Sequence, residues 1–177
     1  VTGSRIKRLD AEGSLPVTII DREMIELSGE SSVADYLRSL SFNSFGSYRS
    51  DMGSDDQGTA QISLRGLGSN RSLVLIDGRR LPKAPQSTAY QDLNTIPMGA
   101  VERIEILSDG ASAIYGSDAI GGVVNVITRE DYNGWELMYG RSEPSAGGES
   151  DYGSVMFGTS NTNWNLIATL SWNNRDI

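Results

Sequence analysis

The sequence predicts an α+β fold: a mixed-sheet unit followed by antiparallel strands of the kind that cross a membrane in a β-barrel. Helix-like and strand-like segments alternate over the first 130 residues, whereas residues 164–172 alternate strictly between apolar and polar side chains. Glycine accounts for 20 of 177 residues, which is more than its usual share of about 7%. This excess indicates many turns. We therefore expect one domain at residues 1–130 and about three barrel strands at residues 131–177, too few to close a barrel.

The composition excludes several classes of function. The chain has no cysteine and no histidine, which removes thiolate nucleophiles, Cys/His zinc sites and Ser-His-Asp triads. Fifteen basic and 23 acidic side chains give a net charge of -8, the opposite of the basic footprint of a nucleic-acid-binding protein. We expect no nucleic-acid partner, no metal and no cofactor. The chain opens at Val1 without a leader, and we interpret it as a mature or trimmed form.

The first third of the chain predicts a strand, two helices and a long loop. The β-branched residues 17–20 favour a strand, and the acidic turn after Asp21 favours a short helix ending near Gly29. A second helix, capped by Ser31 or Ser32, ends near Ser41 and has apolar residues at helical spacing. Residues 42–61 lose all periodicity and predict a loop of a length that is uncommon unless it has a function.

The middle of the chain predicts the strands of a mixed sheet. Residues 62–65 and 72–76 favour strands, and Asp77-Gly78 is a strong signal for a two-residue hairpin turn that returns through residues 79–81. After a second irregular loop at residues 82–94, strands are expected at 101–107 and 123–128. The segment 108–122 between them is rich in small residues, and we assign its glycines to backbone geometry.

The last segment has the pattern of a transmembrane barrel strand, with an aromatic residue at each end of an apolar face. That face contains Trp164, Leu166, Ala168, Leu170 and Trp172. Weaker strands precede it at residues 134–140 and 154–158. Because barrels keep short turns on the periplasmic side, the turn at residues 161–163 places the entry of the first of these strands in the periplasm. An edge strand of a soluble β-sandwich has a similar alternation, so the pattern alone leaves this alternative open.

Sequence motifs for catalysis or nucleotide binding fail on inspection. Residues 66–71 begin like a dinucleotide fingerprint, but Arg71 replaces the third glycine and a strand follows; residues 116–121 have phosphate-loop spacing without the lysine. Three aspartates at 51–56 do not fit a calcium loop. Glu102 and Glu105 lie an odd number of residues apart on a strand, which sends them to opposite faces. We therefore predict no enzymatic activity.

Two segments carry a family resemblance. Residues 62–82 contain LRGLGSNRSLVLIDGRRL, and residues 101–128 contain ILSDGASAIYGSDAIGGVVNVIT. Together with residues 93–97 they resemble the plug domain of TonB-dependent outer-membrane receptors, over essentially residues 1–130. Residues 1–6 resemble the segment at or just after the TonB box. The resemblance implies a plug inside a barrel of about 22 strands, with this chain as the N-terminal part of a larger receptor.

The resemblance also implies a function. Such a receptor binds a scarce extracellular nutrient, such as an iron-siderophore, cobalamin or a carbohydrate, and admits it to the periplasm when TonB, energised by its inner-membrane complex, moves the plug. The expected location is the outer membrane, with the barrel in lipid and the plug's N-terminus facing the periplasm. No covalent chemistry is involved. Ligand binding is expected to alter the plug's N-terminal segment allosterically.

Three groups of residues follow as candidates. The ligand-binding candidates, on the two irregular loops at the plug's apex, are Phe45, Tyr48, Arg49, Asp51, Gln57, Lys83, Gln86, Ser87 and Tyr90. The candidates next to TonB are Val1, Thr2 and Gly3. The candidates for ion pairs between plug and barrel are Arg65, Arg79, Arg80, Glu102, Arg103 and Glu105.

Two other classes of function stay open from the sequence. A secreted or surface carbohydrate-binding or adhesive β module would stack the loop aromatics on sugars, and it would place Trp135, Trp164 and Trp172 in water or in a soluble core. A carboxylate hydrolase would rely on Glu102 and Glu105, and it is the weaker alternative because these residues are expected on opposite faces.

Overall fold

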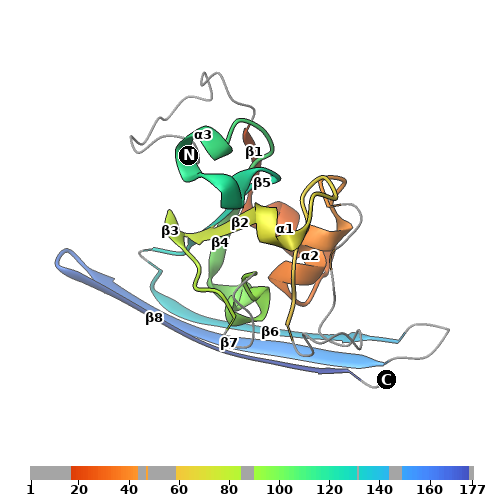
Figure 1. Ribbon diagram of the computed structural model, residues 1–177. Coiled ribbons are helices and arrows are strands. Elements are labelled where there is room, and N and C mark those ends of the chain that lie inside the picture. The colour runs from red at the N-terminus through yellow and green to blue at the C-terminus, as the bar shows by residue number, and fades with distance from the viewer. Residues whose placement is uncertain are drawn as a thin grey trace.

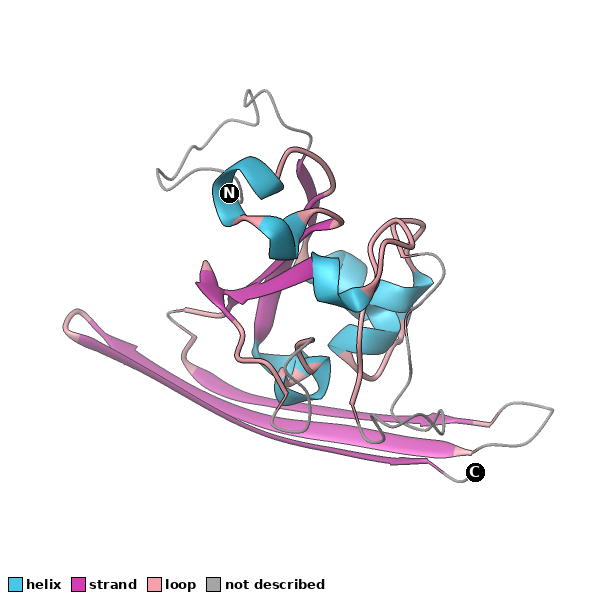
Figure 2. Cartoon of the chain, viewed as in Figure 1, coloured by secondary structure: helices cyan, strands magenta, loops and turns pink. Residues whose placement is uncertain are grey.

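The computed structural model describes residues 17–43, 47, 59–84, 90–130, 132–143 and 149–175 (Figure 1). Within them, five strands form a mixed sheet and three long strands form a second, antiparallel sheet, with the short helices gathered around the mixed sheet (Figure 2). The elements are β1 Val17–Ile20, α1 Arg22–Ser28, α2 Val33–Ser39, η1 Ser69–Arg71, β2 Ser72–Ile76, β3 Arg79–Arg80, η2 Leu93–Thr95, η3 Met98–Ala100, β4 Val101–Leu107, α3 Ser112–Tyr115, η4 Ser117–Ala119, β5 Gly122–Thr128, β6 Gly134–Ser142, β7 Ser150–Asn161 and β8 Trp164–Arg175.

The mixed sheet has the strand order β1-β4-β5-β2-β3, and within it β2 and β5 run parallel while the other pairs are antiparallel. The predicted hairpin turn between β2 and β3 is confirmed, since Asp77 and Gly78 both have positive φ, at 48° and 77°. The Asp77 carboxylate accepts hydrogen bonds from the backbone N–H of Thr128 at 2.9 Å and from its hydroxyl at 2.7 Å. The turn is thereby fixed to the end of β5.

Both predicted helices are confirmed, and each begins at a side-chain cap. The Asp21 carboxylate accepts from the Met24 N–H before α1, and the Ser32 hydroxyl accepts from the Asp35 N–H before α2. On α2, Val33 and Leu37 are fully buried, as the helical spacing of the apolar residues requires.

The predicted strand at residues 62–65 is wrong. Within the described residues, this segment forms a single bridge, between Leu64 and Asn43. Side chains take the place of a neighbouring strand: the N–H of Ser63 donates to the Ser47 hydroxyl at 2.8 Å, and the N–H of Leu64 donates to the Ser72 hydroxyl at 2.9 Å. The segment is buried and extended, as its apolar residues indicate, but it has no hydrogen-bonded ladder.

Apolar side chains cover both faces of the mixed sheet. On one face, α1 and α2 pack against alternate residues of β2, β4 and β5, among them Ile104, Ile106 and Val124. The other face forms a smaller core with the α3–η4 segment, which includes Leu73 and Leu107. Because successive side chains of a strand point to opposite faces, alternate residues of each strand pack against different helical layers.

The second sheet, β6-β7-β8, pairs in continuous register from Gly134↔Gly158 and from Asn161↔Trp164. It lies along one side of the mixed-sheet unit (Figure 1). The predicted alternation is confirmed on β6 and β8: Trp135, Leu137 and Leu170 are 69%, 77% and 69% exposed on the outer face, whereas residues of the opposite parity face the mixed-sheet unit. Among the described residues, no helix is long and apolar enough to cross a membrane.

Candidate functional site

The two sheets meet where the short helix η3 approaches β7 and β8. A methyl group on Gly99 would lie 3.4 Å from the Ser154 hydroxyl and 3.4 Å from the Thr169 methyl group, so a larger residue has little room there. A cavity of about 250 Å³ adjoins this contact, with serine and asparagine side chains from both sides in its lining. The contact between the sheets is therefore close at one point and polar around it.

An ion-pair cluster at Glu136, on the inner face of β6, joins the two sheets. One oxygen of the Glu136 carboxylate lies 3.3 Å from Nη2 of Arg22, at the start of α1. The other oxygen lies 2.7 Å from Nη1 of Arg129, which follows β5. The Arg22, Arg129 and Glu136 side chains are 13%, 8% and 26% exposed. We call these three residues the Glu136 cluster. Because the cluster is partly buried, its charge-assisted hydrogen bonds are stronger than those of a surface pair.

The arginines of the Glu136 cluster are also bound on the mixed-sheet side. Arg22 donates to the carbonyl oxygens of Met98 at 2.9 Å and Val101 at 3.2 Å, and to Glu26 at 2.7 Å. Arg129 lies 3.8 Å from Glu26 and 3.9 Å from Glu102, and its guanidinium also lies 5.3 Å from the centre of the Tyr132 ring, just before β6. Each arginine therefore connects β6 to a different part of the mixed-sheet unit.

A second polar contact lies at the corner between α1 and α2. The Tyr152 hydroxyl on β7 donates to the Gly29 carbonyl at 3.2 Å, and the Asn173 amide on β8 donates to the Ser31 hydroxyl at 3.2 Å. The Tyr152 ring also covers Gly140 on β6, where a side chain would collide with it. Each strand of the second sheet thus contributes one polar side chain to the segment 22–31.

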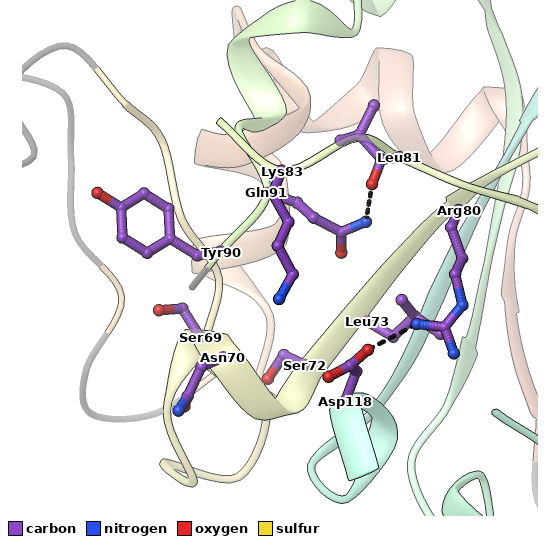
Figure 3. A pocket seen from close by; sticks show the side chains of 10 residues that line it. All are labelled: Ser69, Asn70, Ser72, Leu73, Arg80, Leu81, Lys83, Tyr90, Gln91 and Asp118. Carbon is purple, nitrogen blue, oxygen red and sulfur yellow. Dashed lines mark hydrogen bonds and ion pairs between the residues drawn. The ribbon is translucent and has the colours of Figure 1, made fainter. Parts of the chain in front are cut away.

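A smaller pocket, of about 130 Å³, lies beside the second irregular loop (Figure 3). Lys83 and Gln91 form a bridge at the base of this loop. On the other side, Arg80 pairs with Asp118 at 2.7 Å. The Tyr90 hydroxyl is buried and has no hydrogen-bond partner among the described residues, and Figure 3 shows it directed away from Gln91.

The structure places two of the nine predicted ligand-binding residues, Lys83 and Tyr90, both at this pocket. The other seven lie outside the described residues: Phe45, Tyr48, Arg49, Asp51, Gln57, Gln86 and Ser87. The three predicted TonB-proximal residues, Val1, Thr2 and Gly3, also lie outside them. Ligand and TonB contacts at all of these positions stay predictions.

Five of the six predicted ion-pair residues lie within 4.0 Å of an oppositely charged side chain inside the mixed-sheet unit, among the described residues. Arg65 lies 3.9 Å from Asp109, Arg80 pairs with Asp118, and Arg103 pairs with the buried Glu105 at 3.1 Å. Glu102 lies 3.9 Å from Arg129, and Arg79 is exposed on β3. Contacts of these residues with barrel strands beyond β8 stay a prediction.

The residues that join the two sheets are not among those predicted from the sequence. Glu136 could have been found, because it is an acidic residue on the inner face of a strand whose outer face is apolar. Arg129 directly follows the last strand of the mixed sheet. Arg22 gives no comparable signal, since an arginine in the first turn of a short helix is ordinary in a sequence.

Comparison with known proteins places this arrangement in a family. The family described as "TonB-dependent Receptor Plug Domain" matches residues 10–123. The siderophore receptor PirA from Pseudomonas aeruginosa is 27% identical, with a TM-score of 0.65 over 90% of this chain and 28% of that one. PirA from Acinetobacter baumannii is 28% identical, with a TM-score of 0.62 over 90% of this chain and 24% of that one.

A third structure, a variant of the ferric enterobactin receptor PfeA from Pseudomonas aeruginosa in complex with enterobactin, is 25% identical, with a TM-score of 0.67 over 93% of this chain. The chain spans about a quarter of the length of each of these structures, at 28%, 24% and 25%. The family match extends over well more than half of the sequence, from residue 10 to residue 123. The chain therefore belongs to the TonB-dependent receptor plug domain family.

Proposed function

We propose that this chain is the plug and the first three barrel strands of an outer-membrane receptor that takes up iron-siderophores. The observation that carries the proposal is the plug fold packed, through polar contacts, against three strands whose outer face is apolar. The similar solved structures support the substrate class, since they are siderophore and ferric enterobactin receptors. The family is one of receptors rather than enzymes or carbohydrate-binding modules.

In the proposed mechanism, the plug closes the barrel until ligand binds at the apical loops. Residues 1–130 form the plug, and residues from 131 onward form the wall of the barrel, with the plug's N-terminus toward the periplasm. Ligand binding alters the N-terminal segment, and TonB then moves the plug so that the ligand passes. Polar plug–wall contacts suit this task, because ion pairs and hydrogen bonds can exchange with water as the plug shifts.

Uptake measurements on the full receptor test the proposal. Cells that lack other siderophore receptors and express this one are offered ⁵⁵Fe as ferric enterobactin, with and without TonB. We expect iron accumulation that requires TonB. Accumulation that is the same without TonB would refute TonB-driven uptake, and no accumulation from ferric enterobactin or from a panel of other ferric siderophores would refute the substrate class.

Alanine substitutions test the apical assignment. We expect Tyr48→Ala, Arg49→Ala and Tyr90→Ala to weaken binding of the transported siderophore about tenfold or more in combination, because aromatic and cationic side chains supply much of the affinity at buried contacts. Tyr139→Ala is the matched control, since Tyr139 is 68% exposed on the outer face of β6. Unchanged affinity in the triple variant would show that the apical assignment is wrong.

A further inference from the structure

The first strand and the first helix of the plug are held in different ways. β1 is an edge strand whose four residues pair with β4, from Val17↔Leu107 to Ile20↔Ile104, and it lies at the end of the plug away from β6, β7 and β8 (Figure 1). α1 begins two residues later at Arg22, whose guanidinium is 3.3 Å from the wall residue Glu136. Up to Ile20 the chain is therefore held by backbone pairing with β4, and from Arg22 onward it is held by a side-chain contact with β6.

The ten residues from Arg22 onward are attached to all three strands of the second sheet, β6, β7 and β8, which we call the wall strands. Arg22 contacts Glu136 on β6, the Gly29 carbonyl accepts from Tyr152 on β7, and Ser31 accepts from Asn173 on β8. These links leave from different strands, so displacing the segment requires breaking several of them.

The Glu136 cluster is the strongest of these links. The Glu136 carboxylate is shared by two arginines, and Arg22 is bound at the same time to the Met98 and Val101 carbonyls at 2.9 and 3.2 Å. Arg129 is anchored in the plug by its own backbone, whose N–H donates to the Ala100 carbonyl at 2.9 Å. Charge-assisted bonds in a partly buried site are roughly twice as strong as neutral ones.

We propose that the Glu136 cluster is a mechanical stop in the plug. When the N-terminus is pulled, β1 leaves β4 and the displaced segment ends there, while α1 and the residues after it stay on the wall. A pull is transmitted along the chain to the next firm attachment, which after β1 is Arg22. The proposal rests on the proposed function for its source of tension, which is TonB.

Pulling single molecules of the full receptor in lipid measures the stop directly. The chain has no cysteine, so Val1→Cys supplies a handle in this segment. Taut chain spans about 3.5 Å per residue, so the stretch from residue 1 to the stop measures about 70 Å, and the stretch to Gly29 about 100 Å. Once β1 has left β4, we expect the taut chain between the handle and the stop to measure about 70 Å, and we expect the next event to need a higher force.

Two variants make the test specific. In Glu136→Gln we expect the taut chain to measure about 100 Å or more at the first stop, because the carboxylate charge that holds Arg22 is lost and the next attachment is at Gly29. Glu102→Gln is the matched control: it removes the same charge 3.9 Å from Arg129, but Glu102 belongs to the plug, so the taut length of about 70 Å is retained.

Each outcome decides the proposal. A taut length of about 100 Å or more at the first stop in the unaltered receptor, or an unchanged taut length in Glu136→Gln, overturns the stop. A taut length that also increases in Glu102→Gln overturns the role of the wall contact. The stop is a mechanical property, so a receptor that shows the expected taut lengths but no TonB-dependent uptake refutes the proposed function and leaves the stop in place.

Discussion

In this plug, a single side chain can hydrogen-bond backbone N–H and C=O groups that would otherwise pair with a longer neighbouring strand. The Gln91 side chain accepts from the Val74 N–H at 2.6 Å and donates to the Val74 carbonyl at 2.8 Å and to the Leu81 carbonyl. Because β3 is two residues long, the amide of Gln91 extends the pairing of β2 beyond the end of β3. Buried backbone groups need such partners.

Gly122 is a position where we expect substitution to be costly. Its φ is 134°, and a methyl group would lie 2.7 Å from the Leu107 carbonyl oxygen. Gly122→Ala should destabilise the plug by about 3 kcal/mol, since strain and overpacking add. Gly29→Ala is the control, because Gly29 has left-handed φ and ψ of 68° and 8° with open space around it, and it should cost about 1 kcal/mol. Urea unfolding monitored by proteolysis compares them, and equal midpoints would contradict this account.

Tyr36 makes stability depend on pH in the alkaline range. Burial raises the pKa of the Tyr36 hydroxyl above its usual value near 10, and the carboxylate of Asp21 raises this pKa further. The folded chain therefore keeps the proton to higher pH than the unfolded chain. The stability that this contributes is complete below about pH 10 and is lost as pH rises through the folded pKa.

Urea midpoints between about pH 9 and 11.5 test this dependence. The unaltered protein should lose more stability over this range than Tyr36→Phe, which has no proton to release. Because all other tyrosines and lysines titrate in both proteins, parallel curves would mean that Tyr36 does not contribute.

At the scale of elements, the wall strands are specified by their two faces. The outer face of β8 is apolar between Trp164 and Trp172, whereas residues of opposite parity, such as Thr169, face the plug. Glycines on the wall are covered by neighbouring aromatic rings, as Gly153 is by Trp172. This alternation is what a strand between lipid and a polar plug requires.

Neighbouring positions on β8 should therefore respond differently to a charge. Leu166→Arg places a cation on the outer face, where Leu166 is 52% exposed, and should cost about 2 kcal/mol of folding stability in lipid. Asn165→Arg, on the inner face, should cost little. Reversible folding of the receptor into lipid vesicles measures both, and similar losses would argue against a lipid-facing outer surface.

At the scale of the whole molecule, plug and wall are joined by polar contacts around one close approach. η3 packs against β7 and β8 at Gly99, the Glu136 cluster lies on β6, and the corner between α1 and α2 is bound by Tyr152 and Asn173. Such an interface holds the plug in a defined position without a continuous apolar core between the two parts.

The two arginines of the Glu136 cluster should be energetically coupled. Arg22→Met or Arg129→Met leaves Glu136 with one cation, whereas the double variant leaves it with none, so the double loss should exceed the sum of the single losses by about 1 kcal/mol. Resistance of the plug to proteolysis in urea provides the measurement. As a control, Arg65→Met should be additive with Arg129→Met, since Arg65 bonds to the Ile120 and Gly121 carbonyls. Additivity in the first pair would show that the two arginines act separately.

Local sequence pattern is sufficient to predict the helices after Asp21 and Ser32, the turn at Asp77-Gly78, and the three wall strands. These follow from caps, positive φ and strict alternation, which act over a few residues. The strand predicted at residues 62–65 was wrong because its hydrogen-bond partners are side chains instead of a neighbouring strand, such as Ser47, which is 16 residues from Ser63. The tertiary structure alone decided the Glu136 cluster, because Arg22 and Glu136 are 114 residues apart, and no local pattern encodes a contact over that separation.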